Sequence, residues 1–91
     1  MQPVSFGAML RIIHKPNKDY SQGYEYYYNP QQVISVEPVG KKKASMFTAE
    51  SRFYCEEYSN WVGVDCSAEK LVSAIHEAQQ TTDKPYIDLV V

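Results

Sequence analysis

Two cysteines and two histidines are the residues of this 91-residue chain whose types most readily perform nucleophilic catalysis or bind a metal. Cys66 stands just before a predicted helix, where the helix dipole can lower the pKa of a thiol. It lacks a neighbouring base, because His76 lies further along the same helix, about 15 Å away at helical rise. Only His14 could serve instead. A small, semi-buried residue is the simpler interpretation of Cys66.

The other motifs for chemistry are incomplete. The helical segment His76-Glu77-Ala78-Gln79-Gln80 lacks the second histidine of the zinc motif H-E-x-x-H, and the cysteines have no paired ligand spacing. Ser67-Ala68-Glu69-Lys70 fits the S-x-x-K pair of penicillin-recognising enzymes, but their S-D-N and K-T-G motifs are absent. No glycine-rich phosphate-binding loop occurs. We therefore predict no enzymatic activity, no catalytic residue, no metal and no cofactor.

Tyrosine is the most unusual feature of the composition, with 8 residues in the chain. Four of them, Tyr24, Tyr26, Tyr27 and Tyr28, fall in one short predicted strand. In a strand Tyr24, Tyr26 and Tyr28 share one face, and Tyr27 points to the other. A single sheet covered by one helix buries only one face, so some of these rings must be exposed or lie in an interface. Tyrosine is enriched in interfaces, and we predict that these four bind a protein.

Charge is unevenly distributed along the chain. Residues 1–48 carry a net charge of +3 and residues 49–91 a net charge of −5, which favours association through opposite faces. The run Lys41-Lys42-Lys43 after Gly40 predicts an exposed hairpin tip, either merely solvated or in contact with phosphate or an acidic protein. Combined with tyrosine stacking, it suggests single-stranded nucleic-acid binding, which the pI of about 5.6 opposes.

The length and the residue pattern indicate one domain over residues 1–91, in the cytoplasm. No run approaches the length of apolar sequence that spans a membrane, so we expect no membrane association. The N-terminal residues lack the pattern of a signal peptide, and two cysteines form no disulfide framework.

Periodicity predicts an α+β fold. Alternating apolar and aromatic residues predict strands over 6–14, 24–29, 32–39, 44–49, 52–58, 61–64 and 86–91, with a turn at Glu50-Ser51. Ser67 is the expected N-cap of a helix that runs to about Gln80. The apolar stripe of that helix is Ala68, Leu71, Val72, Ile75 and Ala78. We expect an antiparallel sheet of four to six strands, with this one helix in the C-terminal half packed on one face.

Two stretches resemble the small flagellar-regulator FlbD family. Tyr28-Asn29-Pro30-Gln31-Gln32-Val33-Ile34-Ser35-Val36-Glu37 resembles that family's strand pattern N-P/D-x-x-I-x-x-I-E. Val64-Asp65-Cys66-Ser67-Ala68-Glu69-Lys70-Leu71-Val72 resembles the pattern V-x-E-S-x-E-E-V that begins its helix. The chain departs from the family in its N-terminal stretch, in the region of residues 44–58 and in its C-terminal strand. The resemblance implies a small non-enzymatic regulatory protein and supplies no catalytic residues.

Together these features predict a small protein-binding module, a regulator or inhibitor that acts through a tyrosine-rich sheet face or edge. Its partner would be another protein, a second copy in a homodimer, or both. Three alternatives stay open: a single-stranded nucleic-acid binder that uses Lys41–Lys43 and tyrosine stacking, an inhibitor of a host complex from a phage or mobile element, and, least favoured, a small cysteine-dependent enzyme.

Overall fold

Short alternating segments and one capped helix give the chain its elements. The structure, a computed structural model, describes residues 7–16, 21–44 and 47–91, with the backbone alone for 40–44 and 47–48. The strands in these residues are β1 (Met9–His14), β2 (Tyr24–Tyr28), β3 (Val33–Ala44), β4 (Phe47–Cys55), β5 (Asn60–Val64) and β6 (Tyr86–Val90). The helix α1 spans Ala68–Gln80, and two single 3-10 turns are η1 (Pro30–Gln32) and η2 (Glu56–Tyr58). The predicted α+β class is confirmed.

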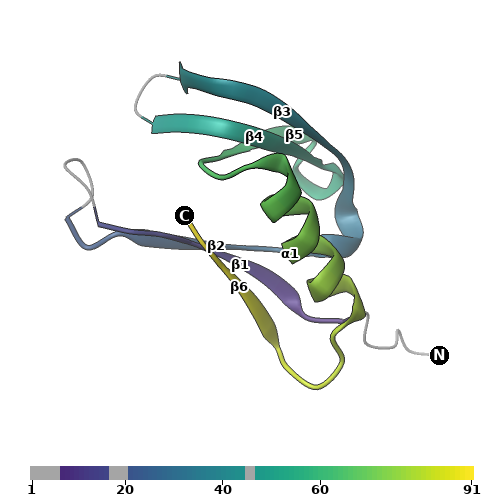
Figure 1. Ribbon diagram of the computed structural model, residues 1–91. Coiled ribbons are helices and arrows are strands. Elements are labelled where there is room, and N and C mark those ends of the chain that lie inside the picture. The colour runs from purple at the N-terminus through teal and green to yellow at the C-terminus, as the bar shows by residue number, and fades with distance from the viewer. Residues whose placement is uncertain (1–6, 17–20, 45–46) are drawn as a thin grey trace.

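The strands form two small sheets rather than the single expected sheet. One sheet, with the order β2-β1-β6, lies opposite the other, with the order β3-β4-β5 (Figure 1). Most neighbouring strands are antiparallel, but β6 runs parallel to β1, with Met9 opposite Tyr86 and Ile13 opposite Val90. The last strand of the chain therefore completes the sheet that the first strand begins.

A tight corner at Asn29 and Pro30 sends the chain from the first sheet into the second. The Asn29 side chain accepts a hydrogen bond of 2.9 Å from the Gln31 backbone N–H, as an N-cap does. Pro30 occupies the first turn of η1, where its missing N–H costs nothing, and it is buried. Because β3 leaves this corner in the second sheet, it does not pair with β2.

The helix begins where the sequence predicts. Ser67 Oγ accepts a hydrogen bond of 3.2 Å from the Lys70 backbone N–H, which confirms the cap. Leu71 and Ile75 are buried as expected, and α1 packs against strands of both sheets along one side of the gap between them (Figure 1). The buried residues around the helix come from both sheets: Leu10, Ile12, Phe53, Val64, Ile87 and Leu89.

Two local predictions in the middle of the chain are wrong. Residues 40–43 continue β3 instead of forming a hairpin tip, and the β3–β4 ladder extends through Lys42, Lys43 and Ala44. The expected turn at Glu50-Ser51 is the interior of β4. Ser51 is fully buried there, and its hydroxyl donates a hydrogen bond of 2.7 Å to the Cys66 carbonyl. The polar residues at positions 50 and 51 suggested a turn. The structure instead keeps a serine hydroxyl inside the strand, because it donates a hydrogen bond to a residue far along the chain. Phe6 and residues 45–46, which the strand predictions included, lie outside the described residues.

Candidate functional site

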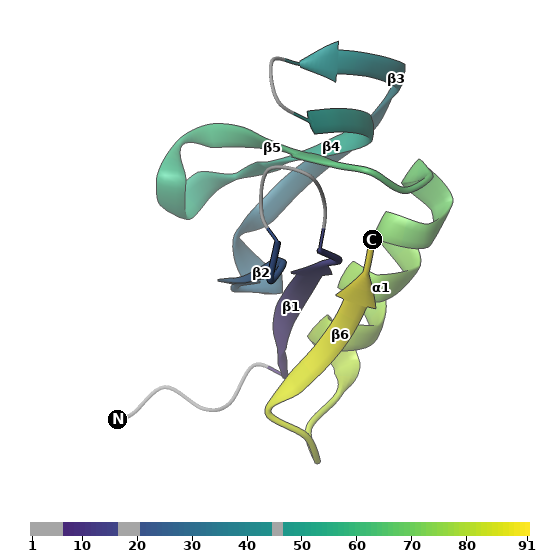
Figure 2. The same cartoon turned by 90° about the vertical axis from the view of Figure 1, so that its left-hand side faces the viewer.

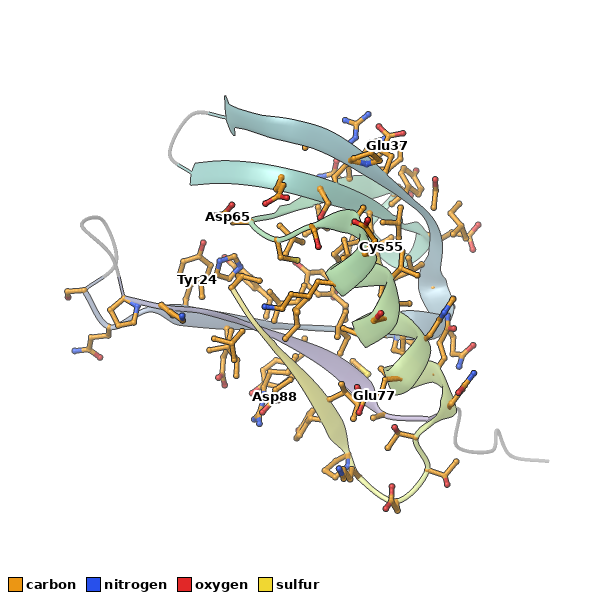
Figure 3. All side chains as sticks on the ribbon, viewed as in Figure 1. Tyr24, Glu37, Cys55, Asp65, Glu77 and Asp88 are labelled. Carbon is orange, nitrogen blue, oxygen red and sulfur yellow. The ribbon has the colours of Figure 1, made fainter. Side chains whose placement is uncertain are left out.

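Three of the four predicted tyrosines point toward the core, and the fourth points away from it. In the β1–β2 ladder Tyr28 lies opposite Leu10 and Tyr26 opposite Ile12, and residues directly opposite each other project to the same side. Leu10 and Ile12 are core residues, so Tyr24, Tyr26 and Tyr28 share their face, as the alternation predicted. Figure 3 shows Tyr24 on the side that faces the second sheet and Asp88 on the opposite side of the first sheet.

Burial of this tyrosine row decreases from Tyr28 toward Tyr26. The Tyr28 ring meets the buried Phe53 ring edge-on, with 5.1 Å between the ring centroids, and burial raises the pKa of its hydroxyl to about 12. The side chain of Tyr26 is 52% exposed. Tyr24 stacks on His14, with 4.2 Å between the ring centroids. The row therefore joins a ring packed on the core, that of Tyr28, to an exposed ring, that of Tyr26, and ends at the half-buried Tyr24.

Three of the four predicted tyrosines line an open groove of about 400 Å³ together with residues of η2 and β5, and Tyr24 is not among the described residues of that lining. The lining residues are Tyr26, Tyr27 and Tyr28 of β2, Tyr58 of η2, and Asn60 and Val62 of β5. Figure 2 shows β2 and β5 away from the side of the molecule that α1 occupies. The groove thus lies on the side of the fold that the helix leaves open, and we call it the tyrosine groove.

Tyr58 is the residue of the tyrosine groove that sequence reasoning missed. The pattern placed it at the end of a predicted strand, but β4 stops at Cys55 and Tyr58 sits in η2. Its ring lies at a right angle to that of Tyr28, 5.9 Å between centroids, and its side chain is 55% exposed. The two residues are far apart in the chain, so only the facing of the two sheets brings them together.

The polar groups of the groove include several hydrogen-bond donors. Asn60 Oδ1 accepts from the Trp61 backbone N–H at 2.9 Å, which leaves the amide NH₂ group as the available part of that side chain. The hydroxyls of Tyr26, Tyr28 and Tyr58 make no hydrogen bond within the part of the chain that the structure describes. The Tyr27 hydroxyl instead donates to Glu25 at 2.6 Å.

The groove lies between the two strand edges that carry the least protection. Edge strands normally carry proline, lysine, a bulge or a covering element, which prevents unwanted pairing. On β3, Pro38, the lysine run and two shifts of register serve this purpose, and α1 packs against β6. β2 and β5 contain no proline and no lysine, and the ladder between β1 and β2 runs without a shift of register. These are the edges that a partner can approach.

The outer faces of both sheets carry cations that are already paired. Arg11 forms two hydrogen bonds with Asp88 and lies over the Tyr86 ring, and its guanidinium lowers the pKa of the Asp88 carboxyl. On the second sheet Arg52 pairs with Glu37 and lies 4.1 Å from the Trp61 ring centroid. Because these charges satisfy one another, the outer faces offer a partner less than the tyrosine groove does.

The cysteines and histidines do not assemble into a reactive site. Both cysteines are buried, and burial raises the pKa of the Cys66 thiol, opposite to the lowering that its place before the helix suggested. His14 is half-buried against Tyr24, and His76 is exposed on α1 beside a second groove of about 320 Å³ between the helix and β3. Among the described residues, no group of three His, Cys, Asp or Glu side chains could hold a metal ion.

None of the helices formed by residues 7–16, 21–44 and 47–91 is long and apolar enough to cross a membrane.

The lysine run lies apart from the tyrosine groove. Residues 41–43 belong to β3, whose ladder places Lys42 opposite Ala49 and Lys43 opposite Thr48 of β4. β4 separates this strand from β5, so the run lies at the opposite edge of the second sheet from the groove. The side chains of these lysines lie outside the described residues.

Comparison of the chain with protein-family models, with curated proteins and with solved structures finds no match. The resemblance to the FlbD family therefore stays a prediction. The fold and the site define a small α+β protein with a solvent-open aromatic groove between two sheet edges.

Proposed function

We propose that this protein is a non-enzymatic binding module that recognises another polypeptide through the tyrosine groove. The observation that carries the proposal is the convergence of three tyrosine rings, those of Tyr26, Tyr28 and Tyr58, on one groove between two unprotected edges. Tyrosine provides a large apolar contact area, two side-chain torsions and a polar tip, which makes it a frequent energetic hot spot in interfaces.

A partner chain is favoured over a second copy of this protein as the occupant. The elements that line the groove carry Glu25, Glu56 and Glu57 and no lysine or arginine. In a symmetric dimer the same patch meets itself, so pairing through this groove would bring like charges together. The prediction of a homodimer is therefore less well supported for this surface than the prediction of a separate partner.

Nucleic acid is also disfavoured as the partner. Binding to single strands combines aromatic stacking with a basic groove that follows the phosphates. Here the aromatic groove is flanked by acidic residues, and the lysine run lies at the far edge of the second sheet. The single-stranded nucleic-acid alternative predicts a steep salt dependence that Lys→Gln changes at positions 41–43 would flatten.

A displayed library of random peptides tests the proposal, because it assumes no partner. We expect the wild-type protein to enrich peptides whose binding depends on Tyr26 and Tyr58. Both side chains are more than half exposed, so their removal should leave the core intact. Tyr26→Ala and Tyr58→Ala should each weaken binding by about 2 kcal/mol, or roughly 30-fold.

Ile34→Ala is the matched control, because Ile34 is 61% exposed and lines the second groove instead. It should bind the selected peptides as the wild type does. The proposal fails if selection enriches no peptide above background, or if the selected peptides bind Tyr58→Ala and the wild type equally well.

A further inference from the structure

We propose that the ligand of the tyrosine groove is an extended, proline-rich segment flanked by basic residues. The inference rests on the proposed function and specifies the chemistry of its partner. Three observations carry it: the hydrogen-bond donors in the groove, the arrangement of its rings and the charge of the elements around it.

The donors of the groove match the carbonyl groups that a polyproline II segment leaves free. A polyproline II segment has no internal hydrogen bonds, and its proline residues carry carbonyls but no N–H. The tyrosine groove presents the hydroxyls of Tyr26, Tyr28 and Tyr58 and the amide NH₂ of Asn60. Burial holds the Tyr28 hydroxyl in its protonated, donating form far above neutral pH.

The rings provide walls for pyrrolidine side chains. The ring centroids of Tyr28 and Tyr58 are 5.9 Å apart, with an angle of 88° between the ring planes. Those of Tyr26 and Tyr28 are 6.4 Å apart, with an angle of 52°. Rings inclined to one another leave ring faces accessible at the surface instead of closing them in a stack. Proline-rich segments dock in aromatic-lined grooves of this kind, and their preformed conformation keeps the entropic cost of binding small.

The charge of the surroundings selects basic residues at the ends of the segment. Glu56 and Glu57 immediately precede Tyr58 and are exposed, whereas Glu25 projects from β2 to the outer face with Tyr27. Within the described residues Glu56 and Glu57 form no ion pair. Exposed charges next to Tyr58 in the chain act over one screening length, roughly 8 Å at physiological ionic strength. They attract a ligand with arginine or lysine and repel one with aspartate or glutamate.

Fluorescence anisotropy with three labelled synthetic peptides tests the inference on the full-length protein. The probes are a run of prolines with an arginine at each end, the same run with an aspartate at each end, and an alternating Thr-Val peptide with arginine ends. We expect the Arg-flanked proline peptide to bind tightest, with the Asp-flanked peptide about tenfold weaker.

Variants locate the contact. Tyr26→Ala and Tyr58→Ala should weaken binding of the Arg-flanked proline peptide about 30-fold. Tyr28→Phe keeps the ring and removes the donor, so it should weaken binding about two- to tenfold without disturbing the core. Ile34→Ala should bind this peptide as the wild type does.

Two results overturn the inference. One is that the Arg-flanked proline peptide does not bind, or binds Tyr58→Ala as well as the wild type. The other is that the Thr-Val peptide binds more tightly, which would show strand addition at β2. If the random library nevertheless yields Tyr58-dependent peptides without proline, the proposed function stands and only the ligand chemistry is wrong; if it yields none, the proposed function fails.

Discussion

Replacement of Ser51 by alanine should destabilise the protein more than replacement of a solvent-exposed serine by alanine. The Ser51 hydroxyl is fully buried in the middle of β4 and donates a hydrogen bond of 2.7 Å to the carbonyl of Cys66, itself a buried residue. Among the described residues no buried side-chain nitrogen or oxygen lacks a partner, so this hydroxyl belongs to a fully satisfied core.

The expected magnitude follows from what the alanine variant leaves behind. The variant loses a hydrogen bond and leaves the Cys66 carbonyl without a hydrogen-bond partner and away from water. This should reduce the free energy of unfolding by about 1–3 kcal/mol. A domain of this size has a free energy of unfolding of roughly 5–14 kcal/mol, so the loss is a substantial fraction. Each kcal/mol should lower the melting temperature by roughly 4–8 °C.

Urea unfolding followed by circular dichroism measures the effect, and an unchanged slope m would show that only stability has changed. Ser35→Ala is the control, because Ser35 is an exposed residue of the neighbouring strand. Ser51→Cys puts a slightly larger side chain with a weaker donor in the same place and should fall between wild type and Ser51→Ala. If Ser51→Ala and Ser35→Ala unfold at the same urea concentration, the Cys66 carbonyl does not depend on this hydroxyl and the reasoning is refuted.

Three further predictions concern the helix, the pH dependence and the thiols. Leu71→Ala should reduce the free energy of unfolding by about 2–5 kcal/mol because the side chain is fully buried, whereas Ser73→Ala, on the exposed face of α1, should change little; equal losses in urea unfolding would contradict the packing. Burial lowers the pKa of His14 below its ordinary value of 6.5, so its contribution to stability is present above pH 6.5 and is lost as the pH falls toward the lower folded-state pKa. Melting temperatures measured from about pH 7.5 to 5.5 should therefore decline less in His14→Phe than in the wild type, and equal declines would rule out this role. Cys55 and Cys66 should react slowly with a thiol reagent in the native protein and rapidly in urea, and fast native labelling would contradict their burial.

Elements with a strong local signal were predictable from the sequence. The helix has a side-chain cap at Ser67 and an apolar stripe that includes Leu71 and Ile75, and both signals act within a few residues. The alternation around Leu10 and Ile87 likewise placed β1 and β6, because a half-buried strand must alternate.

The region between the corner and β5 was less predictable, because long-range contacts decide it. Gly40 and the following lysines have low strand propensity, yet pairing with β4 carries β3 through them, with an irregularity between Pro38 and Lys42 that absorbs the mismatch. Glu50-Ser51 has the residue types of a turn, which is why a turn was predicted there. The Cys66 carbonyl that accepts the Ser51 hydroxyl lies 15 residues further along the chain, in the segment before α1. Periodicity gives no information about such partners.

The division into two sheets also explains why the sequence predicted only the residues on one side of the tyrosine groove. The strand of tyrosines was recognisable by itself, but its function as one wall of a groove depends on Tyr58, Asn60 and Val62 facing it from the other sheet. An expectation of one sheet placed the exposed tyrosines on an open face. Two facing sheets place three of them on an inner face that is covered at one end and open at the other.

The corner at Asn29 and Pro30 is the physical origin of both the division and the groove. By turning the chain out of the first sheet, it leaves β2 with β1 as its neighbour, and the order β3-β4-β5 makes β5 an edge of the second sheet. The Gln79 amide donates a hydrogen bond of 3.0 Å to the Pro30 carbonyl, which ties α1 to the corner and fixes the side on which the helix covers the core. The opposite side, between β2 and β5, is then left open, and there the sequence has tyrosines and glutamates instead of the prolines and lysines that protect β3. An edge kept open by the fold and left without protection by the sequence is consistent with a surface whose partner is another polypeptide.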